Sequence, residues 1–159
     1  MEIKRLKKEN YDELISLLNI VFSKQNKCIM DFERELPNMC IRDDAHMRKH
    51  VGLFVDGKLV SVVGVYPLPT KVLDKEINFC TVGNVATHPD YEGNGYMNIL
   101  LTRAMEIVKE ENYDICRLGG DRARYLRFGF ELCGGNYSYY VTQKNTKKSL
   151  LCGYGQNTR

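Results

Sequence analysis

The chain has 159 residues, 43% of them hydrophobic, and a formal net charge of +3. This length fits one domain, and the apolar fraction is large enough for a packed core that needs no disulfides. Lysine and arginine are interspersed with acids, so no nucleic-acid partner is expected; no stretch approaches the ~20 apolar residues of a membrane span, so no membrane partner is expected either.

The N-terminal third is predicted to hold a strand and two helices. The first ten residues, MEIKRLKKEN, lack the apolar segment of a signal peptide, which favours a cytoplasmic location, and residues 2–6 form the opening strand. Asn10 caps a helix whose apolar residues recur at helical spacing: Leu14, Leu17, Leu18, Val21 and Phe22. A shorter second helix is expected after residue 28; it ends at Pro37 and is followed by a charged loop up to residue 49.

The middle of the chain carries the strongest strand signals. Residues 51–55 and 58–66 are apolar runs separated by Asp56-Gly57, a pair that supplies the positive φ angles of a type I′ turn. A third strand over 75–87 follows a turn at Pro67 and Pro69. These segments predict three consecutive antiparallel strands.

The remaining elements alternate between helix and strand. An amphipathic helix is predicted over 97–109, a strand over 114–119, a short helix over 121–128 and a pair of strands over 130–142. The fold class is therefore α/β, with a central mixed, mostly antiparallel sheet flanked by helices on both faces. Residues 1–142 are assigned to this domain, and the polar residues 143–159 are expected to form a flexible tail.

One segment, VGNVATHPDYEGNGYMNILL (82–101), carries a candidate anion site. A strand ends near Thr87, a glycine-rich turn follows, and a helix begins near Tyr96. This order gathers unpaired backbone N–H groups of residues 93–98 at a helix N-terminus, where they can bind anionic oxygens. Gly93 and Gly95 lack a Cβ, so a phosphate can approach the backbone closely. Taken alone, these residues are equally consistent with an ordinary turn.

The longer context resembles the cofactor motif of the GNAT superfamily of N-acetyltransferases. That motif reads V-x-V/T-x-P-x-[Y/H]-[R/Q]-x-x-G-x-[G/A], and in register with it stand Val85, Thr87, Pro89, Tyr91 and Gly95. Residues 125–131, Tyr-Leu-Arg-Phe-Gly-Phe-Glu, resemble the family's Y-x-x-x-G-F-E ending. The stretch before that ending is most similar to the N-terminal domain of Eis-type acetyltransferases, which are longer enzymes that acetylate amines.

The resemblance implies an activity and a set of site residues. We expect an N-acetyltransferase that moves an acetyl group from acetyl-CoA to a primary amine by direct attack. Tyr125 matches the tyrosine that protonates the departing thiolate. The positions that bind the pantetheine arm match Val85, Ala86 and Thr87, and those of the pyrophosphate loop match Gly93, Asn94, Gly95, Tyr96, Met97 and Asn98. The favoured acceptor is a small-molecule amine such as an aminoglycoside, ahead of a protein lysine, and a homodimer is compatible with the family.

Departures from the motif keep a second function open. Glu92 stands where the motif has Arg or Gln, and Met97 stands where it has Gly or Ala. The family's strand glutamate falls on Thr81, which cannot serve as a base, so Glu33 and an ordered water are the remaining candidates. The alternative function is a degenerate GNAT domain that binds acyl-CoA for regulation without turnover.

His46 and His50 are four residues apart, a spacing that places two side chains on one helical face. The sequence assigns no third ligand to them, and a protein zinc site needs at least three. We therefore expect no metal.

Overall fold

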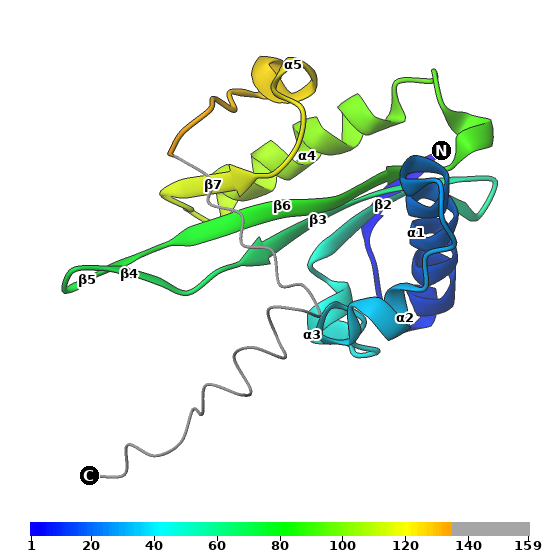
Figure 1. Ribbon diagram of the computed structural model, residues 1–159, viewed down its shortest axis with the longest axis horizontal. Coiled ribbons are helices and arrows are strands. Elements are labelled where there is room, and N and C mark those ends of the chain that lie inside the picture. Colours follow the sequence, from blue (N-terminus) through cyan, green and yellow to red (C-terminus); the bar gives the residue numbers. More distant parts are fainter. Residues whose placement is uncertain (135–159) are drawn as a thin grey trace, which may run out of the picture.

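A five-stranded mixed sheet forms the centre of the molecule in the computed structural model, which describes residues 1–134 (Figure 1). Its strands, in the order β1-β2-β3-β6-β7, are β1 (Glu2–Arg5), β2 (His50–Val55), β3 (Lys58–Pro67), β6 (Phe79–Thr87) and β7 (Ile115–Leu118). All neighbours are antiparallel except β6 and β7, which are parallel because a helix crosses over between them. The predicted fold class is confirmed.

The turn between β2 and β3 has the predicted geometry. Asp56 and Gly57 have φ angles of 49° and 78°, both positive as a type I′ turn requires. Val55 pairs with Lys58 directly across this turn. The turn therefore fixes the register of the hairpin next to it, as far as the pair Phe54 and Leu59, before a register shift between Leu53 and Phe54.

Helices cover the two faces of the sheet separately. Helix α1 (Tyr11–Asn26) lies on one face together with the short helices α2 (Phe32–Glu35) and α3 (Asp44–Met47), and α4 (Tyr96–Glu110) lies on the other (Figure 1). Successive side chains of β3 point to opposite faces of the sheet, so Val62 packs with the buried residues of α1 and Val63 packs with those of α4. Burial of these two apolar layers, at about 25 cal/mol per Å² of apolar surface, holds the sheet between the helices.

The N-terminal segment follows the prediction with two differences. Asn10 precedes α1, but its Oδ1 accepts the N–H of Lys7 at 3.1 Å and does not cap a backbone N–H of the helix. The expected charged loop contains α3, whose start is capped by Asp43 Oδ1 through the N–H of His46 at 2.6 Å. Helix α2 ends before Pro37, as predicted, and a 3₁₀ turn, η2 (Pro37–Met39), follows.

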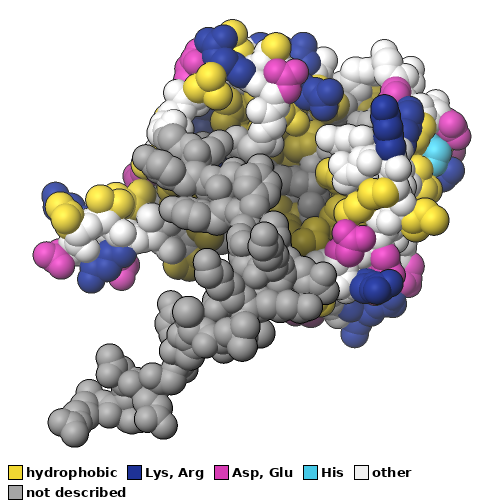
Figure 2. Space-filling view, in the orientation of Figure 1, with side chains coloured by type: hydrophobic (Ala, Val, Ile, Leu, Met, Phe, Trp, Pro, Cys, Tyr) yellow, Lys and Arg dark blue, Asp and Glu magenta, His cyan; other side chains and the backbone are white. Residues whose placement is uncertain are grey.

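The strand predicted over 75–87 is in fact two strands. Strand β5 (Lys75–Ile77) pairs with β4 (Thr70–Val72), which the sequence reasoning missed, and forms a hairpin that projects from the body (Figures 1 and 2). Asn78 interrupts the run because its Nδ2 donates to Glu111 O at 3.2 Å and to Asn112 O at 2.7 Å. These bonds fasten the start of β6 to the end of α4.

The last described elements are short. Helix α5 (Arg122–Tyr125) and the 3₁₀ turn η4 (Leu126–Phe128) replace the single helix predicted over 121–128, and Gly129 ends them with φ 88°. Residues 130–134 are not in a strand, which corrects the start of the predicted final pair. The rest of that pair and the predicted tail at 143–159 lie outside the described residues. No helix of residues 1–134 is long and apolar enough to cross a membrane.

Strand β6 changes its pairing halfway along its length. Val62 of β3 pairs with Ala86 and Gly64 pairs with Gly83, so β6 has one residue more than β3 in this interval, which is a β-bulge. Asn84 lies in the bulge with φ 50°. On the other edge, β7 pairs with β6 only as far as Val82, and the later residues of β6 have no strand partner on that side within the described chain.

Candidate functional site

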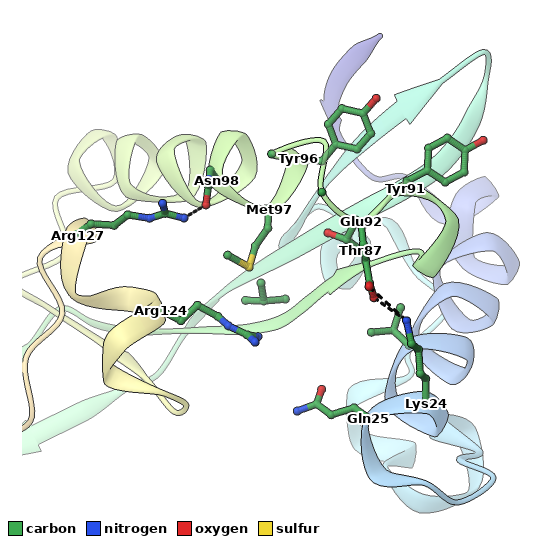
Figure 3. Close-up of a pocket in the computed structure, with 14 residues that line it drawn as sticks. Lys24, Gln25, Thr87, Tyr91, Glu92, Tyr96, Met97, Asn98, Arg124 and Arg127 are labelled. Atoms are coloured by element: carbon green, nitrogen blue, oxygen red, sulfur yellow. Dashed lines mark hydrogen bonds and ion pairs between the residues drawn. The ribbon is translucent and has the colours of Figure 1, made fainter.

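A pocket of about 690 Å³ lies between the end of β6 and the first turn of α4 (Figure 3). The end of β6 contributes Val85 and Thr87, and the glycine-rich turn contributes most of residues 91–98. The remaining walls are the C-terminal half of α1, with Val21, Lys24 and Gln25, and the α5–η4 segment, with Arg124 and Arg127. Four segments that are far apart in sequence therefore meet at one cavity.

The glycine-rich turn has the conformation of an anion-binding loop. It follows the 3₁₀ turn η3 (Pro89–Tyr91), and its Gly93 and Gly95 have φ angles of 83° and 76°. A Cβ built on either glycine would meet no atom within 4 Å, so glycine is needed here for its conformation and not for lack of space. Successive backbone N–H groups in such a turn form a concave site for anionic oxygens.

The backbone donors of this turn extend over residues 93–97. No hydrogen bond within residues 1–134 uses their N–H groups, whereas the N–H of Asn98 already donates to Gly95 O at 3.0 Å. The predicted donor set is therefore one residue too long. The free donors stand at the positive end of the α4 dipole, which favours an anionic ligand.

Three basic side chains line the same pocket. Lys24 comes from α1, and Arg124 and Arg127 come from the α5–η4 segment on the opposite side. In Figure 3 the Arg124 side chain points into the space between α5 and β6, and Arg127 donates to Asn98 Oδ1. Sequence reasoning missed all three; the basic run around Tyr125 was the signal for the arginines, but no local pattern placed α1 beside the loop.

The two departures from the motif have definite positions. Glu92 forms an ion pair with Lys24, its carboxylate oxygens lying 3.1 Å and 3.2 Å from Lys24 Nζ. The negative charge of Glu92 is thus balanced within the pocket wall. Met97 is half-buried, and its side chain extends into the pocket (Figure 3).

The structure brings most of the predicted cofactor residues together. The pocket is lined by Val85, Thr87, Gly93, Gly95, Tyr96, Met97 and Asn98. Ala86 is 2% exposed and packs under α1, so its side chain faces away from the cavity. Asn94 does not line the pocket either, because its Nδ2 turns back to Tyr91 O at 3.0 Å.

Tyr125 lies in the core and not in the pocket wall. Its side chain is 7% exposed and packs edge-on against Phe130, with ring centroids 6.4 Å apart. Gly120 allows this packing, because a Cβ there would lie 2.7 Å from the Tyr125 ring. The neighbours Arg124 and Arg127 face the pocket instead.

The candidate base Glu33 is engaged elsewhere. Its Oε1 accepts the hydroxyl of Tyr11 at 2.8 Å, and burial together with this bond raises the pKa of Tyr11 to about 12. Glu33 is exposed and does not line the pocket. Among residues 1–134, no group of three His, Cys, Asp or Glu side chains is arranged to hold a metal ion.

The family model of the acetyltransferase (GNAT) domain matches residues 2–133. No curated protein matches the sequence. Several solved structures resemble this chain, and the three named below are each under 25% identical to it, so their likeness bears on the fold alone. A GNAT family acetyltransferase of Brucella melitensis in complex with acetyl-CoA has a TM-score of 0.67 and 18% identity, over 82% of this chain and 82% of that one.

Two further solved structures are of longer proteins. A conserved protein of Enterococcus faecalis V583, described as a probable N-acyltransferase, has a TM-score of 0.65 and 18% identity over 80% of this chain. Eis1 of Mycobacterium abscessus has a TM-score of 0.61 and 16% identity over 81% of this chain. The chain spans 31% of the length of each of these two proteins.

Proposed function

Because the chain belongs to the GNAT family of acetyltransferases, we propose that it transfers the acetyl group of acetyl-CoA to the primary amine of a small molecule. The observation that carries the proposal is the turn at residues 93–97, which offers unbonded backbone N–H groups beside basic side chains in one pocket. Acetyl-CoA supplies an acetyl thioester. The residues of this chain bind the thioester, orient it and donate a proton to the departing sulfur.

The pocket fits the pyrophosphate of coenzyme A. Gly93 and Gly95 hold the turn in the left-handed conformation that directs successive N–H groups to one side, and a neutral peptide donor to a charged oxygen contributes roughly 1.5–3 kcal/mol. Arg124 and Arg127 add positive charge around the same cavity, whereas the charge of Lys24 is partly compensated by Glu92. The two sources act together, because the low-dielectric protein walls reduce screening by solvent and so strengthen both.

The pantetheine arm is assigned to the end of β6. Beyond Val82 this strand has no partner on the β7 side among the described residues, and Val85 and Thr87 line the pocket. An unpaired strand edge offers a row of backbone donors and acceptors to an extended amide-containing ligand. Ligand amides would thus take the place of a missing strand, and this contact would orient the thioester.

The attack on the thioester requires a neutral amine, and the departing sulfur requires a proton. In this proposal Tyr125 Oη provides that proton, which is reasonable because a phenol and a thiol have comparable acidities. The C–S bond breaks as the C–N bond forms, and the proton that the nitrogen loses passes to water, from which Tyr125 is reprotonated. Holding amine and thioester together supplies most of the rate by proximity. The favoured acceptor is an aminoglycoside-like amine, on the resemblance of the GDRARYLRFGF stretch to Eis-type enzymes.

Calorimetric titration with acetyl-CoA, followed by an assay of CoA release against an amine panel, tests the proposal. The panel contains an aminoglycoside, a polyamine and a lysine peptide. Release with the aminoglycoside or the polyamine, reduced by about tenfold or more in Tyr125→Phe, is the expected result. Absence of acetyl-CoA binding by the wild-type protein would refute the proposal, and release with the peptide alone would refute the acceptor class.

One observation favours the alternative function, an acyl-CoA-binding domain without turnover. Tyr125 is buried in the core beside Phe130 and does not line the pocket. Acetyl-CoA binding with no CoA release for any amine, and with Tyr125→Phe indistinguishable from wild type, would establish this alternative.

A further inference from the structure

Three side chains from three neighbouring strands form a hydrogen-bonded network at the bulge of β6. His50 comes from β2, Tyr66 from β3 and Asn84 from the bulge itself. Tyr66 Oη lies 2.7 Å from His50 Nε2 and 2.7 Å from Asn84 Nδ2, and Asn84 Nδ2 lies 3.3 Å from His50 Nε2. None of the three lines the pocket described above.

The directions of these bonds follow from the donor and acceptor capacity of each group. Asn84 Nδ2 can only donate, so Tyr66 Oη accepts from it and turns its own hydrogen toward His50 Nε2. His50 Nε2 accepts this hydrogen only if the ring is neutral. Burial of the ring, aided by neighbouring His46, lowers the pKa of His50 to about 4, so the ring is neutral at pH 7.

Two paired glycines make room for the Tyr66 ring. Gly64 and Gly83 face each other across β3 and β6. A Cβ on Gly64 would lie 2.3 Å from Tyr66 Oη, and a Cβ on Gly83 would lie 3.5 Å from the ring. The ring therefore lies across the sheet over these glycines, and its hydroxyl reaches the next residue of β6, Asn84.

The bulge itself needs an anchor. Asn84 has φ 50°, a left-handed conformation that costs a residue with a Cβ about 1–2 kcal/mol, although asparagine adopts it more readily than most. The bond to Tyr66 fastens its side chain on one face of the sheet. Further along β6, after Asn84, Val85 and Thr87 line the pocket.

We propose that Tyr66 and His50 are positioning residues that hold Asn84 in the bulge and thereby set the edge of β6 that receives the pantetheine arm. The inference deepens the proposed function and rests on it, since it concerns the same strand edge. Neither side chain touches the ligand. They act through the backbone of residues 84–87.

Substitution Tyr66→Phe keeps the ring over the glycines and removes the hydroxyl alone. The affinities of two ligands then distinguish the edge of β6 from the turn at residues 93–97. Acetyl-CoA contacts both, whereas 3′-phospho-ADP carries the pyrophosphate but no pantetheine arm. We expect acetyl-CoA to bind about tenfold more weakly to Tyr66→Phe, as loss of one buried hydrogen bond implies. Binding of 3′-phospho-ADP should stay within about twofold, because the turn at residues 93–97 is not touched.

A matched control distinguishes positioning from loss of stability. Ile107→Val removes one methylene from a fully buried position near the end of α4, which destabilises by a similar amount without touching the network. It should leave both affinities unchanged. The variants His50→Gln and His50→Leu provide a rescue test. Glutamine retains a hydrogen-bond acceptor near the Nε2 position, and leucine does not. Acetyl-CoA affinity should therefore be kept in His50→Gln and reduced in His50→Leu.

A ligand-free measurement makes the positioning role independent of the proposed function. In Tyr66→Phe, the backbone chemical shifts of residues 84–87 should change, whereas those of residues 93–97 should not. Unchanged shifts at 84–87, or equal weakening of both ligands, would overturn the inference. Failure of wild-type protein to bind acetyl-CoA, with altered shifts at 84–87, would remove the proposed function and leave a structural role for the network in its place.

Discussion

Lys24 Nζ lies 3.1 Å from Glu92 Oε1, and this ion pair joins the C-terminal half of α1 to the glycine-rich turn before α4. Both side chains are more than half exposed, at 58% and 56%, so the pair contributes at most about 1 kcal/mol to stability. Its larger consequence is electrostatic. The cation is held at the pocket wall, and the carboxylate partly cancels its charge.

Substitution Glu92→Gln should strengthen acetyl-CoA binding about two- to fivefold, because an anionic ligand then meets an uncompensated Lys24. Calorimetry at low and at high salt measures the effect, which should shrink as salt rises. The control is Lys24→Met, which should weaken binding. Equal affinities in Glu92→Gln and wild type at low salt would show that Lys24 does not face the ligand.

Substitution Met97→Ala should also strengthen acetyl-CoA binding, by about two- to fivefold. The thioether side chain extends into the pocket at a position where the motif has a small residue, and alanine is favourable in the first turn of a helix. Met105→Ala is the control, since Met105 is half-buried on the same helix but does not line the pocket. Weaker binding in Met97→Ala would mean that the methionine contacts the ligand favourably.

Substitution Gly95→Ala should lower stability by about 1–2 kcal/mol and acetyl-CoA affinity by about tenfold or more. Its φ of 76° is strained for alanine, and a shift of the turn moves the backbone donors. Gly57→Ala is a matched control, because Gly57 has φ 78° and equally open space but lies in the β2–β3 turn. It should lose similar stability in denaturant melts and keep full affinity; loss of affinity in both variants would refute a specific role for the Gly95 turn.

The free energy of unfolding should decrease as the pH is lowered, because His50 is buried in its neutral form. The folded state lowers the pKa of His50 from 6.5 to about 4, so the unfolded chain binds the extra proton between these values. The contribution is fully present above pH 6.5 and is lost as the pH falls to about 4; its size is on the order of 3 kcal/mol. The charged or titratable groups around the ring are His46, Lys49 and Tyr66.

Urea unfolding of wild type and His50→Gln at several pH values between 7 and 4 isolates this effect. Carboxylates titrate in both proteins, so the difference between their slopes belongs to His50. The wild type should lose more stability than the variant over this interval. Parallel curves would show that the buried imidazole is not held neutral.

The local elements were predictable because short-range chemistry sets them. The Asp56-Gly57 turn requires positive φ at both residues, and the spacing of Leu14, Leu17 and Leu18 requires a helical apolar face. The prediction was wrong where a distant partner decides the structure. Asn78 ends β5 because it bonds to carbonyls at the end of α4, more than thirty residues away in sequence.

The candidate site shows the same division. Gly93 and Gly95 stand in one short stretch of the chain, so the conformation of their turn follows from the sequence, and its binding of an anion stays a prediction. Lys24, Arg124 and Arg127 have no such signature, because only packing of α1 and α5 around β6 brings them to the pocket. Glu92 replaces the Arg or Gln of the motif, and its negative charge alone would oppose an anionic ligand. Its partner Lys24 is brought to it only by folding.

The bulge of β6 marks the limit of sequence reasoning most clearly. The sequence by itself determined the fold family, the glycine-rich turn and the strand before it, because each depends on residues close together in the chain. Only the tertiary structure decided that Gly64 and Gly83 leave room for Tyr66, that Tyr66 joins His50 to Asn84, and that Tyr125 lies in the core. These relations depend on strand register and packing between distant segments, and a one-residue change of register reverses the face on which every side chain lies.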